Sequence, residues 1–161
     1  MRGIVLALGV LLVAAALMGT ATGQARTTWY APLTSAEQVP RNTSAATGQA
    51  SFELAPGGNA LRYWLFVNTL TNPSQGHIHI GPAGQNGPVA VWLYPPAPPP
   101  RPIAGSVTDM VAEGTITAAN FVGPLQGQPF AALITALNNG TAYVNVHTSQ
   151  FPGGEIRGQI R

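Results

Sequence analysis

Glycine and proline interrupt this chain at short intervals, and that spacing constrains its fold more than any other feature. The 161 residues include 19 glycines and 15 prolines, spread along the whole length. Proline breaks a helix and glycine weakens its interior. The short segments between them alternate apolar and polar side chains, which is the period of a β-strand. The sequence therefore predicts an all-β protein, an antiparallel sandwich or barrel.

The alternating segments can be placed along the chain. We expect strands over 27–33, 48–54, 61–68, 76–80, 89–93, 142–148 and 155–161, with weaker strand signals over 103–116. The segment 61–68 carries apolar side chains on both faces, which predicts a central strand covered on both sides.

One short helix near residues 129–138 and one stiff loop complete the expected architecture. Pro129 suits the first turn of a helix, and Gly140 suits the position just beyond its end. Residues 95–102 carry six prolines in eight positions, which favours polyproline II. We expect a stiff surface loop there, and a ligand for a proline-binding module is the alternative.

The N-terminus has the pattern of a secretory signal peptide. Met1 and Arg2 are followed by an apolar run over 3–18 and by small residues over 19–25. The alternative is a retained membrane anchor, but the apolar run is shorter than the ~20 residues that a spanning helix needs. We therefore expect a signal peptide at 1–25 and a single exported domain at 26–161, secreted or periplasmic, that does not associate with a membrane after cleavage.

Composition excludes several classes of function. The chain has no cysteine, which rules out disulfides, thiolate catalysis and thiolate metal sites. Its seven basic residues do not cluster, so no nucleic-acid partner is expected. The five acids are scattered and no Gly-x-Ser-x-Gly motif occurs. We therefore assign no catalytic residue, and an enzyme is the less favoured interpretation.

The clearest functional signal is the placement of the three histidines. His77 and His79 lie in one expected strand and His147 lies in another. Side chains two apart in a strand share a face, so the first two imidazoles point the same way. If the two strands are neighbours, all three rings can converge on one metal ion. The alternative is that the rings are exposed, or buried in hydrogen bonds to neighbouring groups.

The type of ligand narrows the choice of metal. Imidazole suits copper, zinc and nickel, and the affinity order of divalent ions favours copper. Calcium would need several carboxylates. We therefore expect copper first and zinc second.

Three further polar side chains lie close to the histidines in sequence. Asn145 and Glu155 are candidates for hydrogen bonds to the imidazoles, and Glu155 could fix the tautomer of a ligating ring. Arg157 could attract small anions toward a metal. The alternative for Glu155 and Arg157 is a surface ion pair that contributes ~0–1 kcal/mol.

Five motifs occur in an order that resembles the CHRD domain, which is named from chordin and is also found in secreted bacterial proteins. They are Leu33-Thr-Ser-Ala-Glu-Gln-Val-Pro40, Ala46-Thr-Gly48, Gly76-His-Ile-His-Ile-Gly-Pro82 with Gly87-Pro88, Ala142-Tyr-Val-Asn-Val-His-Thr148, and Pro152-Gly-Gly-Glu-Ile-Arg-Gly-Gln-Ile160. The resemblance runs over about 28–161, and the proline-rich segment 95–102 looks like an insertion. It implies an immunoglobulin-like β fold outside the cytoplasm and no defined activity.

A more distant resemblance is to the copper side of Cu,Zn superoxide dismutases, which are Greek-key antiparallel β-sandwiches. It rests on Gly-x-His-x-His, a later histidine in a strand, and a terminal Gly-Gly-x-x-Arg. It implies His77, His79 and His147 as copper ligands and Arg157 as the residue that guides anions. The chain departs from that family because it has no bridging histidine, no zinc-loop ligands and no cysteine pair.

Three functions follow from these patterns. The first is an extracellular or periplasmic copper-binding protein. The second is a metal-free interaction or adhesion module whose partner is an unknown extracellular protein, with aromatic anchors among Trp29, Trp64, Trp92 and Tyr94. The third and least favoured is a dismutase-like copper enzyme.

Overall fold

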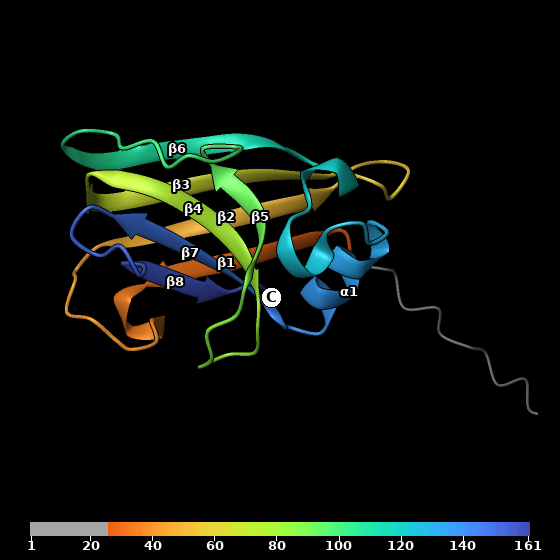
Figure 1. The fold of residues 1–161 in the computed structure, drawn as a ribbon, viewed down its shortest axis with the longest axis horizontal. Helices are drawn as coiled ribbons and strands as arrows, with labels where there is room; N and C mark the ends of the chain where they lie inside the picture. Colours follow the sequence, from red (N-terminus) through yellow and green to blue (C-terminus); the bar gives the residue numbers. More distant parts are fainter. Residues whose placement is uncertain (1–25) are drawn as a thin grey trace, which may run out of the picture.

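The computed structural model describes residues 26–161, so the expected signal peptide lies outside the described residues. Within 26–161 the chain forms eight strands, one α-helix and three short 3-10 helices (Figure 1). The strands are β1 (Thr28–Thr34), β2 (Thr47–Leu54), β3 (Leu61–Thr71), β4 (Pro73–Ile80), β5 (Val89–Tyr94), β6 (Ser106–Ile116), β7 (Ala142–Thr148) and β8 (Ile156–Gln159). The helices are η1 (Ser35–Glu37), η2 (Ala118–Asn120), η3 (Gly123–Leu125) and α1 (Ala131–Asn138).

All eight strands belong to one antiparallel sheet, in the order β5-β4-β7-β8-β1-β2-β3-β6. The sheet folds over itself, so that the half made of β5, β4, β7 and β8 lies in front of the other half in Figure 1. The halves are joined where β8 meets β1, through reciprocal backbone hydrogen bonds of 2.9 Å between Tyr30 and Arg161. The predicted all-β, sandwich-like fold is confirmed, and its two layers are parts of a single sheet.

The hydrophobic core fills the space between the two layers. Alternate residues of each strand point inward, as the period of two requires. Leu33 and Phe52 come from one layer, and Ile78 and Val144 come from the other; all four are almost fully buried. Since these inward positions are apolar, the residues between them in β4 and β7 must point to the outer face of the sheet.

α1 lies with η2 and η3 at one end of the curled sheet (Figure 1). Leu133 and Leu137 of α1 are fully buried in the core. The helix ends where the sequence predicts, with Gly140 at φ +65° just beyond it. Glycine adopts this left-handed conformation without steric cost, so it suits that position. The short helix near 129–138 is confirmed.

The proline-rich loop and the strand predicted over 61–68 are both present in the structure. The segment 95–102 forms an exposed loop whose Arg101 backbone N–H donates to the Ser74 carbonyl, so it is held against β4. The strand predicted over 61–68 lies inside the sheet as β3, but Trp64 and Phe66 on its outer face are only half-buried. The prediction that both faces of this strand are covered is therefore wrong. Large aromatic side chains on a strand surface can be half-buried without a second layer over them.

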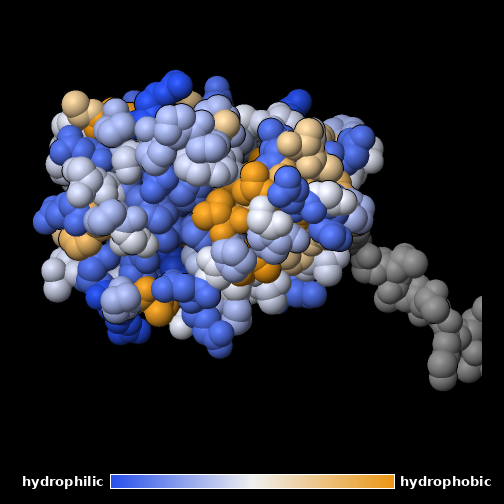
Figure 2. Space-filling model, viewed as in Figure 1, coloured by the Kyte–Doolittle hydropathy of each residue, from blue (hydrophilic) through white to orange (hydrophobic). Residues whose placement is uncertain are grey.

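Figure 2 shows that the face in view is mostly hydrophilic over the strands, with apolar side chains gathered between β5 and the α1 region. Among residues 26–161, no helix is long and apolar enough to cross a membrane.

A substitution at Gly158 tests how closely β8 and β1 pack where the two layers join. A Cβ atom there would collide with the carbonyl oxygen of Pro32 in β1. We expect Gly158→Ala to lower the free energy of unfolding by about 3 kcal/mol, because backbone in two strands has to move apart. Denaturant unfolding measures the change. Gly153→Ala is the control, since a Cβ there meets nothing within 4 Å; equal midpoints for the two variants would contradict the prediction.

Candidate metal centre

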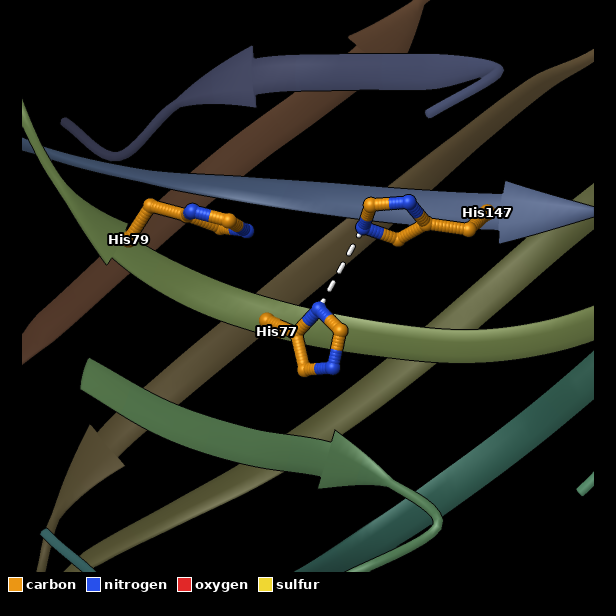
Figure 3. A group of neighbouring side chains, drawn as sticks. All are labelled: His77, His79 and His147. Atoms are coloured by element: carbon orange, nitrogen blue, oxygen red, sulfur yellow. Dashed lines mark hydrogen bonds between the residues drawn. The ribbon is translucent and has the colours of Figure 1, made fainter. Parts of the chain in front are cut away.

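The three histidines come together because β4 and β7 are neighbours in the sheet. In the antiparallel register His77 lies opposite Asn145, His79 opposite Tyr143, and Gln75 opposite His147. Directly opposed residues point to the same face, and the core occupies the inner face. All three imidazoles therefore lie on the outer face of the same two strands, as Figure 3 shows.

The imidazoles are close enough to share one ion. Nδ1 of His77 lies 3.3 Å from Nε2 of His147, and one nitrogen from each of the three rings lies within 4.8 Å of the others. The predicted three-histidine cluster is confirmed. Bonds of about 2.0–2.1 Å to a trigonal or tetrahedral ion place ligand nitrogens about 3.3–3.6 Å apart. One pair already has this spacing, and a separation of 4.8 Å must shorten by about 1.2–1.5 Å.

The cluster is buried although it lies outside the core. His77 is 3% exposed, and His79 and His147 are each 7% exposed. Trp92 of β5 meets the His77 ring edge to face at 4.2 Å between ring centroids. Tyr143 stacks on His79 at 4.9 Å with an interplanar angle of 11°. Aromatic rings thus cover the imidazoles and limit the access of water.

Two backbone carbonyls fix the tautomers of two of the rings. Nδ1 of His79 lies 2.9 Å from the Gly87 oxygen, and Nδ1 of His147 lies 2.9 Å from the Pro152 oxygen. A carbonyl only accepts, so each Nδ1 must carry the proton and each Nε2 keeps a lone pair. The bare nitrogens of both rings then face the cluster, which is the arrangement that ligating histidines require.

One buried nitrogen aimed into the cluster lacks a hydrogen-bond partner. Nε2 of His79 is inaccessible to solvent and bonds to nothing among residues 26–161; Nε2 of His77, on the far side of its ring, is also unpaired. Buried polar atoms without a partner are rare and call for an explanation such as an ion. A metal ion would satisfy the His79 nitrogen.

Burial keeps the histidines neutral. It lowers the pKa of His77 to about 3, and the nearby His147 and His79 add to the effect. It lowers the pKa of His79 to about 4, although the hydrogen bond to Gly87 opposes the shift. The pKa of His147 is lowered by burial as well, against the hydrogen bond to Pro152. At neutral pH the rings are therefore neutral, and each keeps one unprotonated nitrogen that can bind a metal.

Glu155 and Asn145 are buried close by but bond to other groups. The carboxylate of Glu155 accepts hydrogen bonds of 2.6 Å from the hydroxyls of Ser44 and Thr148. Oδ1 of Asn145 accepts a 2.6 Å hydrogen bond from Nε2 of Gln38. These two residues were candidates for hydrogen bonds to the imidazoles, but the Nδ1 atoms of His79 and His147 bond to backbone carbonyls instead.

Arg157 is hydrogen-bonded to the loop between β4 and β5. Its guanidinium lies 3.5 Å over the ring of Tyr143, and it donates to Oδ1 of Asn86 at 3.1 Å and to the Gln85 oxygen at 2.7 Å. β4 and β8 flank β7 on opposite sides, so His79 and Arg157 cover opposite faces of the phenol ring. Arg157 is only 1% exposed, and burial lowers its pKa.

Sequence reasoning missed the groups that orient the rings. Gly87 supplies a carbonyl to His79, and its own N–H donates to Oη of Tyr143 at 3.0 Å. Pro152 supplies the carbonyl for His147. Both lie in the Gly-Pro and Pro-Gly-Gly turn motifs. These motifs signal a tight turn, but they give no indication of where a carbonyl points.

The chain thus carries a buried three-histidine cluster on the outer face of an antiparallel β-sandwich. The family model of the CHRD domain matches residues 29–160, so the chain belongs to the CHRD-domain family. No curated protein and no solved structure matches this chain. The resemblance to superoxide dismutases thus has no support from these comparisons.

The lowered pKa values predict that acid destabilises the metal-free protein. Below pH 6.5 the unfolded histidines bind protons, whereas His77 and His79 of the folded chain, with pKa values of about 3 and about 4, stay neutral until lower pH. The unfolded state then binds more protons, so stability falls as pH falls. From pH 7.5 to 5 we expect a loss of up to about 2 kcal/mol for each of His77 and His79, and a further loss in the same direction from His147.

Denaturant unfolding in the presence of a chelator measures this loss. The control replaces all three histidines with glutamine, and since the chain contains no others, its stability should change little over the same range. The same pH dependence in both proteins would show that the histidines are not its source.

Proposed function

We propose that this protein is an exported CHRD-domain protein that binds one copper ion through His77, His79 and His147, with zinc as the second choice. Its role is to sequester or deliver the ion. The observation that carries the proposal is the convergence of three imidazoles on the outer face of β4 and β7, with the unprotonated Nε2 of His79 and of His147 turned toward the cluster. The CHRD family and the signal-like N-terminus support export.

The choice of copper follows from the ligands. All three are imidazoles, and the one buried carboxylate among residues 26–161, that of Glu155, is bonded to two hydroxyls. Neutral nitrogen ligands favour copper in the affinity order of divalent ions. A structural zinc site has four protein ligands, and the group found among residues 26–161 offers three.

Binding is a better supported role than dismutase-like catalysis. Anion attraction needs a cation that is free to meet the anion. The guanidinium of Arg157 is instead stacked on Tyr143 and bonded to Asn86 and Gln85. The cluster is also closed by Trp92 and Tyr143, which favours holding an ion over turning over a substrate.

Copper titration of the mature protein tests the proposal. We expect one copper per chain, a raised Tm and quenched tryptophan fluorescence, because Trp92 lies 4.2 Å from the His77 ring. His79→Ala should weaken binding by more than the roughly 10–100-fold that is lost with an outer partner of a ligand.

Gln49→Ala is the matched control, because it truncates an exposed residue of β2 in the other half of the sheet. It should bind copper like the wild type. Equal copper affinity in the wild type and in His79→Ala would refute the proposal and leave a metal-free interaction module.

A further inference from the structure

We infer that the three-histidine site selects copper in its cuprous state, Cu⁺, over Cu²⁺ and Zn²⁺. This inference rests on the proposed copper-binding function and adds the oxidation state and coordination number of the ion. Three features of the site support it: the number of ligands, the charge around them, and the closure of the cluster.

The number of ligands suits a monovalent ion. Among residues 26–161, the group that can hold a metal contains His77, His79 and His147 and no carboxylate. Cu⁺ has a filled d shell and is satisfied by three ligands. Cu²⁺ prefers a square-planar or tetragonal set of at least four, and Zn²⁺ prefers four. The phenol group of Tyr143 is hydrogen-bonded to Gly87, whose N–H it accepts and to whose oxygen it donates.

The charge of the surroundings also favours a monovalent ion. The ligands are neutral, so the full charge of the ion is brought into a buried site. The desolvation cost of an ion rises with the square of its charge, which makes it fourfold larger for a divalent ion. Arg157, stacked on the other face of Tyr143 from His79, repels a divalent ion twice as strongly as a monovalent one.

The closure of the cluster limits water as an additional ligand. The His79 nitrogen that faces the cluster is inaccessible to solvent, and no histidine is more than 7% exposed. Trp92 and Tyr143 pack against the rings. Divalent ions complete their coordination with water where protein ligands are few. A three-coordinate ion needs no such water.

Two competition titrations of the mature protein test the inference. Cu⁺ is titrated without oxygen in the presence of ascorbate, with bicinchoninate as the competing chelator. Cu²⁺ is titrated in air against a chelator of known affinity and followed by electron paramagnetic resonance. We expect one Cu⁺ per chain, bound at least ~100-fold more tightly than Cu²⁺. Equal or tighter Cu²⁺ binding that is lost in His79→Ala would overturn the inference and keep the copper function. Binding of neither ion would overturn both.

Asn145→Asp tests the charge argument with a small change of shape. Asn145 lies opposite His77 on the same face, and an aspartate can still accept the hydrogen bond from Gln38. The added negative charge should strengthen Cu²⁺ binding at least ~10-fold more than Cu⁺ binding. The control is Asn59→Asp, which makes the same change in the exposed turn between β2 and β3. An unchanged ratio of the two affinities in Asn145→Asp would contradict the charge argument.

Discussion

Two hydrogen bonds fix the orientation and the tautomer of two of the three clustered imidazoles. Nδ1 of His79 donates to the Gly87 carbonyl, and Nδ1 of His147 donates to the Pro152 carbonyl. Each bond places the proton on the nitrogen that faces a loop and leaves the lone pair on the nitrogen that faces the cluster. Without them either ring could rotate or change tautomer. The capacity to bind a cation therefore depends on backbone that does not itself touch the ion.

The loops that supply these carbonyls are anchored by buried polar groups. Arg157 bonds to the loop between β4 and β5, and Glu155 bonds to Thr148, where the loop after β7 begins. Glycine permits the close approach: a Cβ on Gly87 would collide with the Ile80 carbonyl, and one on Gly154 would collide with Asn145. Turn motifs that look unrelated to the histidines thus help to position them.

Much of the site could be predicted from the sequence, because side chains in a strand alternate between two faces with a period of two. That period placed His77 and His79 on one face and put Ile78 on the other. Strand pairing joins residues far apart in the chain, so the closeness of His147 remained a hypothesis until the register was known. The partners of Glu155 and Arg157 were missed because alternation gives the face of a side chain but not its neighbours. Folding of one sheet into both layers was missed for the same reason.

Long-range ¹H–¹⁵N NMR of the metal-free protein near neutral pH shows which imidazole nitrogens carry a proton, and so tests whether bare nitrogens face the cluster. We expect neutral rings with the proton on Nδ1 of His79 and His147, and a bare Nε2 in both. On addition of Cu⁺ the signals of both bare nitrogens should shift. A proton on Nε2 of either ring, or doubly protonated rings at this pH, would contradict the account.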